Sequence, residues 1–563
     1  SPPSSRRGSG AGRRLGAVQQ RFAVFSKAFD VEDAGGRAVL RVRSPIWRFW
    51  TFAFERQGAE VARVEKRWTG KPQPRAGGET ASSWTRPLHP GWVPGRPTTG
   101  GEPRSPVGSF GAPPPGGLDP GVNVADLLRF PDGFLWGTAT SAHQVEGGNA
   151  RNDWWAWEQV PGHIRGGDTS RVACDFWNRA EDDFRLAKDL GTSAVRISIE
   201  WSRIEPEDGV FDDEALARYR RMLLALRDLG LEPMVCLFHF TLPEWVARRG
   251  GFETDFGVER FLRFCERVVT AYQPLVRWWL TVNEPVVYAA LGWIEGVWPP
   301  GKRDLRLALR VLRHLVRAHA GAYGLIHRLD PDCWVGAGLH LASFEPFDPK
   351  ARLDRGVAWL RDRIANRTWL EATLDGFLRP PLGLYEPVAE AVDSHDFLGL
   401  QHYFTYPLGF SLLSPGRLFA RERQPPRPDT PPFMGEFRPE GLGEWAERLA
   451  RYRKPIVVTE HGLLENEERD RPGWLVRALA GLHRASGRGA EVLGYFHWSL
   501  LDNFEWAEGL SARFGLIHVD FATQTRTVKP SGRVYGEIAR QNGIPRALAE
   551  RVSRELARAL FAA

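Results

Sequence analysis

The chain has 563 residues, 42% of them hydrophobic, so it is long and apolar enough for one large folded domain and a smaller appendage. The excess of positive charge lies in the appendage, because residues 1–120 hold 19 basic and 9 acidic residues, whereas the remainder of the chain is nearly neutral. Since the large domain carries no basic excess, we expect no nucleic-acid partner. No apolar run reaches the length of a membrane-spanning helix, and no charged-then-apolar leader opens the printed sequence. The four cysteines form no ligand pattern, so we expect reduced thiols in a cytoplasmic protein.

The first 120 residues divide into three parts. Residues 1–16 are rich in Ser, Gly and Arg, which predicts a disordered basic tail. Residues 17–70 contain short alternating apolar segments separated by turn residues, which predicts a β-meander. The stretches AGGRAVLRVRSP and VARVEKRWTG in this meander resemble part of the phospholipid-scramblase/tubby-like family, but only a fragment of such a domain is present, and we do not expect it to bind membranes. Residues 71–120 contain 12 Pro and 10 Gly, which predicts a linker.

From residue 130 onward, strand-like segments alternate with helical stretches, which predicts an α/β fold, a (β/α)8 TIM barrel with long βα loops over residues 121–545. The helical stretches include 180–190 and 214–229, whose apolar residues follow the 3.6-residue helix period. The eight predicted strands are 134–140, 194–200, 232–238, 278–283, 334–339, 397–401, 456–460 and 495–498.

The last segment, residues 546–563, is predicted to be a single helix. Four apolar residues lie on one side of it: Leu548, Val552, Leu556 and Leu560. This side is expected to pack against the barrel or against a partner subunit, so a homo-oligomer is one of the expected states.

One glutamate, Glu284, directly follows the predicted strand 278–283, and another, Glu460, is the last residue of the predicted strand 456–460. Arg277 to Val282 is a short β-rich run that leads into Asn283-Glu284 before Pro285 stops the strand, and the apolar run 455–458 leads into Thr459-Glu460. If the strands are counted correctly, Glu284 ends the fourth and Glu460 the seventh, so both carboxyl groups face the same mouth of the barrel. Two carboxyl groups at one mouth are suited to acid/base and nucleophilic chemistry on one substrate.

The motif TVNEP at 281–285, followed by VTEHG at 458–462 with the two glutamates 176 residues apart, resembles the retaining β-glycosidases of glycoside hydrolase family one. The resemblance covers about residues 130–541. It implies that Glu284 is the acid/base and Glu460 the nucleophile, with their carboxyl groups about 5 to 5.5 Å apart. The implied activity is hydrolysis of terminal non-reducing β-D-glucosides, and also of β-galactosides and β-fucosides, with retention. This chemistry needs no metal ion and no other cofactor, and the partner is a small-molecule β-glycoside or oligosaccharide.

The same resemblance assigns supporting and sugar-binding roles. Arg196 is implied to orient the nucleophile, Asn283 to contact the 2-hydroxyl, and Tyr403 to touch the nucleophile. The implied sugar-binding residues are Gln144, His239, Trp498, Glu505 and Trp506. Aromatic faces such as those of the two tryptophans can stack on the C–H surface of a sugar ring.

Three positions depart from the family pattern: Phe240 stands where Trp is common, Gln401 where Asn is common and His461 where Asn is common. They remove neither catalytic carboxyl, but Phe240 and Gln401 can alter the sugar subsite. Two alternatives to hydrolysis stay open at this stage. One is a transglycosidase that uses the same intermediate, and the other is a non-catalytic sugar-binding or membrane-associated protein.

Overall fold

The computed structural model divides the chain into two compact units, residues 1–103 and 104–563. It describes five strands between residues 17 and 65 of the first unit, and residues 126–414, 417–422 and 434–561 of the second. The predicted basic tail at 1–16 and the predicted linker at 71–120 lie outside the described residues.

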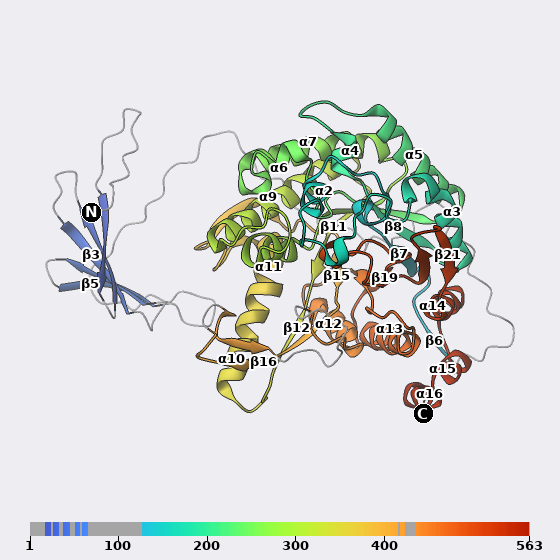
Figure 1. Ribbon diagram of the computed structural model, residues 1–563. Helices are drawn as coiled ribbons and strands as arrows, with labels where there is room; N and C mark the ends of the chain where they lie inside the picture. The colour runs from blue at the N-terminus through green and yellow to red at the C-terminus, as the bar shows by residue number, and fades with distance from the viewer. Residues whose placement is uncertain are drawn as a thin grey trace. The chain divides into compact units, whose positions relative to one another are not determined.

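The first unit contains a five-stranded sheet in which each strand pairs antiparallel with the next one along the chain (Figure 1). Its strands are β1 (Ala17–Ala23), β2 (Ser26–Glu32), β3 (Ala38–Pro45), β4 (Thr51–Arg56) and β5 (Ala59–Glu65). In β2, Phe29-Asp30-Val31-Glu32 alternates apolar and charged residues, which is typical of a strand with one polar face. The similarity to the scramblase/tubby-like family stays a prediction.

The second unit is built around a closed barrel of eight parallel strands, which confirms the predicted fold class. The strands follow one another around the barrel in chain order, as expected when consecutive strands are neighbours. They are β7 (Leu135–Ala139), β8 (Ala194–Ser198), β9 (Glu232–Cys236), β10 (Trp278–Asn283), β11 (Trp334–His340), β15 (Leu398–Gln401), β18 (Ile456–His461) and β19 (Val492–Trp498).

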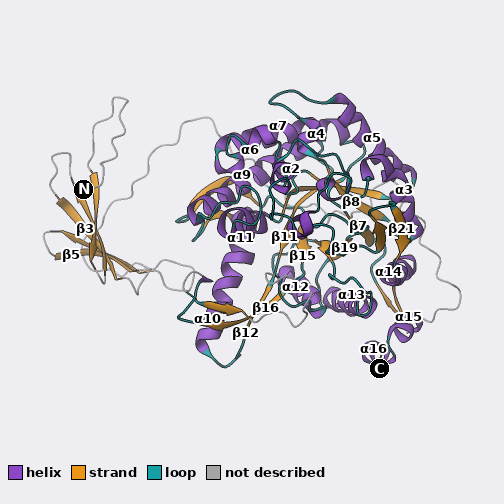
Figure 2. Cartoon of the chain, in the orientation of Figure 1, coloured by secondary structure: helices purple, strands orange, loops and turns teal. Residues whose placement is uncertain are grey.

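A ring of helices covers the outside of the barrel (Figures 1 and 2). Its longer members are α3 (Phe176–Asp189), α5 (Asp213–Asp228), α7 (Asp255–Tyr272), α9 (Leu305–Leu329), α12 (Glu440–Ala450), α13 (Arg471–Gly487) and α14 (Pro530–Gln541). Local signals start these helices: Asp212 caps α5 and Asp304 caps α9, each accepting hydrogen bonds from two backbone N–H groups. Among the described residues, no helix is long and apolar enough to cross a membrane.

Two apolar layers hold the barrel together. The inner layer consists of side chains that alternate along the strands and fill the barrel, such as Met234 and Cys236 on β9 or Phe496 and Trp498 on β19. The outer and larger layer lies between the strands and the helices. A filled interior fixes the strands relative to one another, so residues at their carboxyl ends are held in defined positions.

Smaller elements decorate the barrel. β6 (Leu127–Arg129) pairs with β22 (Gly543–Pro545), which joins the two ends of the described unit, and β20 (Ile517–Asp520) forms a hairpin with β21 (Thr525–Val528). Two βα loops contribute to a further small sheet: β12 (Ser343–Pro346) and α10 (Arg352–Asp362) follow β11, and β16 (Thr405–Phe410) and β17 (Ala420–Glu422) follow β15. The remaining elements between β11 and β15 are α11 (Thr368–Asp375), β13 (Gly376–Leu378) and β14 (Glu386–Val392).

The prediction of a single C-terminal helix is wrong. The segment forms two helices, α15 (Arg546–Val552) and α16 (Arg554–Phe561), because Ser553 is extended and its hydroxyl accepts a hydrogen bond from the backbone N–H of Leu556. Serine is a favoured residue for starting a helix in this way. The apolar side chains do pack on the main core of the second unit, with Leu548 fully buried, as expected for contact with the barrel.

Candidate active site

The ten predicted site residues lie on or just after the barrel strands. Since the strands are parallel, their carboxyl ends share one face, and segments far apart in the sequence meet there. On strands lie Arg196 (β8), Asn283 (β10), Glu460 (β18) and Trp498 (β19). After strands lie Gln144 on α1 (Ala142–Val145), His239, Glu284, Tyr403, Glu505 and Trp506.

Glu460 is a buried carboxyl group held from two sides. The Arg196 guanidinium lies 2.5 Å from one carboxylate oxygen, and the Tyr403 hydroxyl donates to the other at 2.9 Å. The register of β18 shifts near this residue against both neighbouring strands, an irregularity that re-aims side chains. Burial raises the pKa of Glu460 above its ordinary value; Arg196 opposes this, the charge of Glu284 adds to it, and the Tyr403 hydrogen bond opposes it.

Glu284 follows β10 directly and has a left-handed backbone, with φ of 42° and ψ of 58°. Such a conformation is uncommon for a residue other than glycine, and strained residues of this kind cluster at active sites. Its backbone N–H donates to the carbonyl of Gly338 on the next strand, and Pro285 then begins α8 (Pro285–Ala290). The side-chain oxygen Oε1 lies 3.0 Å from Nδ1 of His340. Glu284 is therefore held by two neighbours on β11, Gly338 through its backbone and His340 through its carboxyl group.

Asn283 is fully buried, and its carboxamide is oriented by Gln401. The oxygen Oδ1 accepts from Gln401 Nε2 at 2.7 Å and from Arg196 at 3.5 Å. Its Nδ2 is buried and has no hydrogen-bond partner among the described residues. Gly338 leaves room for this pair, because a Cβ atom there would lie 2.6 Å from each of the two side chains. The Nδ2–H donor at the end of β10 is therefore unused, and the oxygen of a ligand hydroxyl can accept a hydrogen bond from it.

His239 contacts Arg196 and two tryptophans. Its Nδ1 lies 3.1 Å from the guanidinium, and because a guanidinium can only donate, Nδ1 must accept and Nε2 must carry the proton. Burial lowers the pKa of His239 well below its usual value, and Arg196 lowers it further, so the imidazole is neutral. The ring is nearly parallel to Trp498 and Trp506, at interplanar angles of 11° and 15°.

Glu505 and Gln144 form a second polar cluster at the mouth. Gln144 Nε2 donates to Glu505 at 3.3 Å and to Asn503 at 3.2 Å, and its oxygen accepts from Ser141 at 2.6 Å. Burial raises the pKa of Glu505 to about 8, the charge of Glu460 adds to this, and a hydrogen bond from Trp498 opposes it. A protonated carboxyl can donate as well as accept, which suits two adjacent sugar hydroxyls.

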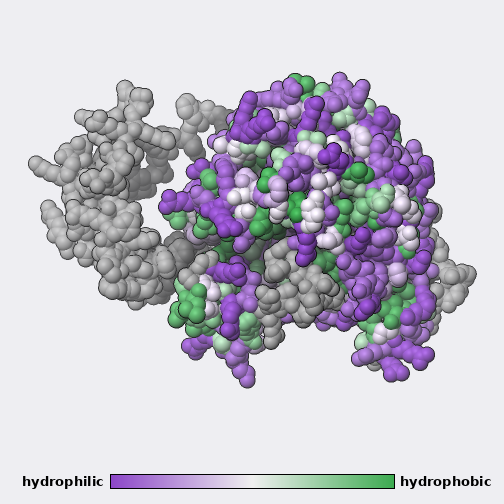
Figure 3. Space-filling view, in the orientation of Figure 1, coloured by the Kyte–Doolittle hydropathy of each residue, from purple (hydrophilic) through white to green (hydrophobic). Residues whose placement is uncertain are grey.

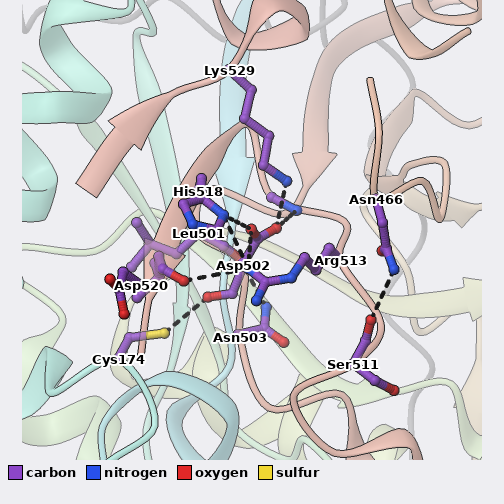
Figure 4. A network of polar contacts seen from close by, with 12 residues as sticks. Cys174, Asn466, Leu501, Asp502, Asn503, Ser511, Arg513, His518, Asp520 and Lys529 are labelled. Atoms are coloured by element: carbon purple, nitrogen blue, oxygen red, sulfur yellow. Dashed lines mark hydrogen bonds and ion pairs between the residues drawn. The ribbon is translucent and has the colours of Figure 1, made fainter. Parts of the chain in front are cut away.

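A charged network anchors the loop that carries Glu505 and Trp506 (Figure 4). The carboxylate of Asp502 is fully buried and contacts Lys529 at 2.7 Å, Arg513 at 3.1 Å and His518 at 3.3 Å. It also accepts from the backbone N–H of Gly515 at 3.0 Å. These partners come from β20 and from the segments flanking the hairpin, so the loop after β19 is tied to the β20–β21 hairpin that follows it.

Sequence reasoning missed several of these residues. His340 is the first residue beyond the predicted fifth strand, and the rule that strand ends face the mouth could have identified it. Gln401 was noted only as a departure from the family, whereas its contact with Asn283 joins residues 118 positions apart. The partners of Asp502 carried no recognisable local signal.

The other two departures occupy different surroundings. Phe240 has a φ of 72°, and its buried ring packs 4.9 Å from Trp298 and 5.4 Å from Trp506, so it borders the aromatic side of the mouth. His461 is fully buried and stacks on Trp474 of α13 at 4.5 Å. His461 therefore lies between the barrel and its helices and does not face the mouth.

The sequence of this chain matches the family model "Glycosyl hydrolase family 1" over residues 127–380 and 390–544. "Beta-glucosidase A" of Thermotoga maritima is 33% identical over 449 residues, which cover 74% of this chain and 99% of that protein. A "Beta-galactosidase" of Sulfolobus acidocaldarius is 30% identical over 484 residues, covering 75% and 97%.

Solved structures agree with these sequence matches. The "beta-glycosidase from Pyrococcus horikoshii" superimposes with a TM-score of 0.70 at 34% identity, covering 76% of this chain and 98% of that one. A "Beta-glucosidase from Thermotoga maritima in complex with glucoimidazole" gives a TM-score of 0.69 at 31% identity, covering 74% and 99%. The barrel, the paired carboxyl groups and these matches over nearly the whole length of the relatives lead to one conclusion. The chain belongs to glycosyl hydrolase family 1.

Proposed function

We propose that this chain is a retaining exo-β-glycosidase that hydrolyses terminal non-reducing β-D-glucosides by double displacement. The observation that carries the proposal is Glu460, held by Arg196 and Tyr403 at the mouth that also contains Glu284. Relatives named as β-glucosidases support the glucoside, and the relative named as a β-galactosidase supports acceptance of β-galactosides. We extend the expected range to β-fucosides.

In the first half of the proposed reaction, the Glu460 carboxylate attacks the anomeric carbon while the bond to the leaving oxygen breaks. The Glu284 carboxyl gives its proton to that oxygen. Arg196 and Tyr403 favour the ionised form of Glu460 against the effect of burial. The product is a glycosyl ester of Glu460 and a released alcohol.

In the second half, Glu284 is ionised and takes a proton from water, whose oxygen attacks the anomeric carbon. The ester bond breaks and the Glu460 carboxylate is restored, so protons and charge balance over the cycle. The buried Asn283 donor is proposed to bind the 2-hydroxyl, where contacts strengthen in the transition state. Gln144, His239 and Glu505 are proposed to bind the outer hydroxyls, with Trp498 and Trp506 against the ring.

The proposal includes a small-molecule β-glycoside or oligosaccharide as the substrate and a cytoplasmic location. All four cysteines are free and buried, which supports a reducing compartment.

Self-association is proposed as well. It is supported by exposed apolar side chains on α10, such as Leu353 and Trp359, each 60% exposed. Figure 3 shows hydrophobic residues on the surface in the region of α10.

The test is release of p-nitrophenol from the β-glucoside, β-galactoside and β-fucoside by the full chain, with Glu460→Ala and Glu284→Ala in parallel. We expect turnover of the β-glucoside by the unsubstituted chain and none by Glu460→Ala. With azide, Glu284→Ala should form the β-glycosyl azide, because a small nucleophile needs no general base. Proton NMR should show the β-anomer of the sugar as the first product.

Inactivity of the unsubstituted chain on all three substrates, or an α-anomer as first product, would contradict the proposal. Product analysis at high acceptor concentration separates the hydrolase from a transglycosidase. A transferase would form new glycosides faster than free sugar.

A further inference from the structure

His340 lies at the mouth of the barrel and has no part in the mechanism described above. It is the last residue of β11, two positions after Gly338, so both positions face the same side of the strand. A Cβ atom at Gly338 would meet the side chains of Asn283 and Gln401, which places this side of β11 toward the site. The side chain of His340 is 15% exposed, so it borders the open part of the mouth.

The imidazole of His340 lies between Glu284 and Tyr403, the residue that donates to Glu460. Its Nδ1 lies 3.0 Å from Oε1 of Glu284. Its ring is nearly parallel to that of Tyr403, with centroids 6.0 Å apart and an interplanar angle of 13°, and Phe404 lies 5.9 Å away. Tyr403 in turn donates to Glu460. Two aromatic rings therefore fix the orientation of the imidazole that contacts Glu284.

The position of the proton in this contact decides what Glu284 can do. If the carboxyl proton were on Oε1, it would be donated to Nδ1 of His340 and would not reach a leaving oxygen. If Nδ1 carries a proton and donates it to Oε1, the carboxyl proton must reside on Oε2. Only the second arrangement leaves the carboxyl proton free to protonate a substrate. The same hydrogen bond from Nδ1 to Oε1 can form when Glu284 is ionised.

We propose that His340 is a positioning residue for Glu284: its Nδ1–H holds Oε1, so that Oε2 alone exchanges protons with the leaving group and with water. The inference rests on the acid/base role proposed for Glu284. Without His340, the carboxyl group is free to rotate about its last side-chain bond, and misplacement of a reacting group by a fraction of an ångström slows proton transfer.

The experiment compares substrates that differ in their need for a proton. A 2,4-dinitrophenyl β-glucoside has a leaving group that departs unprotonated, whereas methyl β-glucoside requires an acid. In the full chain, we expect His340→Ala to lower kcat/KM about tenfold or more on the methyl glucoside and less than about twofold on the dinitrophenyl glucoside. Because the site of His340 is partly open, added imidazole should restore part of the activity on the methyl glucoside.

His327 provides a matched control. It lies 2.8 Å from the carboxylate of Asp396, whose backbone N–H donates to Val335 near the start of β11, so this His–carboxylate pair is at the opposite end of the strand. His327→Asn should leave the ratio of the two substrates unchanged. If His340→Ala folds poorly by circular dichroism, His340→Gln, which keeps a donor, should restore the ratio of the unsubstituted chain.

Equal losses on the two substrates, or no loss on either, would overturn the role of His340. Glu284→Ala separates this failure from failure of the proposed function. A strong dependence on the leaving group in Glu284→Ala but none in His340→Ala contradicts the inference alone, and so does a His340→Gln variant whose ratio of the two substrates differs as strongly as that of Glu284→Ala. Absence of leaving-group dependence in Glu284→Ala contradicts the acid role itself.

Discussion

At the scale of single residues, opposing electrostatic effects decide the state of Glu460. Burial favours the neutral carboxyl, whereas Arg196 and the Tyr403 hydroxyl favour the carboxylate. A nucleophile must be ionised, so the groups that oppose burial determine the lowest pH at which the site works. The same reasoning assigns the hydroxyl of Tyr403 a measurable effect on the pH profile.

We expect Tyr403→Phe to move the acid limb of kcat/KM toward higher pH by about one unit. The Tyr403 hydrogen bond lowers the pKa of Glu460, so its loss raises that pKa and the carboxylate forms only at higher pH. The measurement is a pH profile of p-nitrophenyl β-glucoside hydrolysis. Tyr452→Phe, which alters a tyrosine whose hydroxyl contacts the neighbouring Arg451, serves as the control. An unchanged or lowered limb would contradict the prediction.

A substitution of Gln401 tests whether this residue orients the carboxamide of Asn283. Gln401→Leu removes the hydrogen bond to Asn283 Oδ1, so the carboxamide loses the partner that turns its donor outward. We expect kcat/KM to fall about tenfold on p-nitrophenyl β-glucoside, equivalent to about 1.4 kcal/mol. The 2-deoxy-glucoside lacks the hydroxyl in question and should be affected much less. Equal losses on the two substrates would show that Gln401 acts on something other than the 2-hydroxyl contact.

At the scale of secondary-structure elements, the loop after β19 depends on distant partners. It carries Glu505 and Trp506, and it is held by the buried carboxylate of Asp502 against cationic side chains from the segments that flank the β20–β21 hairpin. The loop has little regular structure of its own apart from a short 3-10 turn at Trp506–Glu508. Its conformation therefore relies on this charged anchor.

We expect Asp502→Ala to destabilise the second unit by about 3 kcal/mol, because Lys529 is buried and would lose its counter-charge. Thermal unfolding followed by circular dichroism should show a midpoint lower by about 3 °C. Asp182→Ala removes an exposed carboxylate paired with Arg185 and should leave the midpoint nearly unchanged. Equal midpoints for the two variants would refute a structural role for the network.

At the scale of the whole molecule, every residue of the candidate site belongs to the second unit. The first unit has its own sheet, in which each strand pairs only with strands of the same unit. The chemistry proposed here draws on nothing before residue 126. The two units can therefore be separated in an experiment.

We expect residues 104–563 to hydrolyse p-nitrophenyl β-glucoside with the same kcat/KM as the full chain, to within about twofold. The full chain carrying Glu460→Ala provides the inactive reference. A shortened chain that unfolds at the same temperature as the full chain but has lost activity would show that the first unit contributes to the site.

The eight barrel strands could be predicted because each is a short run of apolar, β-branched or aromatic residues, and such runs are local properties of the sequence. The paired carboxyl groups could be predicted because both follow such runs. The break at Ser553 was missed, since the apolar period continues across it and a single hydroxyl starts the second helix.

The sequence by itself determined the barrel, the family and the positions of Glu284 and Glu460 along the chain, because local periodicity and short motifs carry that information. Only the tertiary structure decided which side chains meet these residues. The contact of His340 with Glu284 spans 56 residues, and that of Gln401 with Asn283 spans 118. Each contact exists because barrel closure brings the ends of separate strands together, and no local pattern specifies the distance between side chains on different strands.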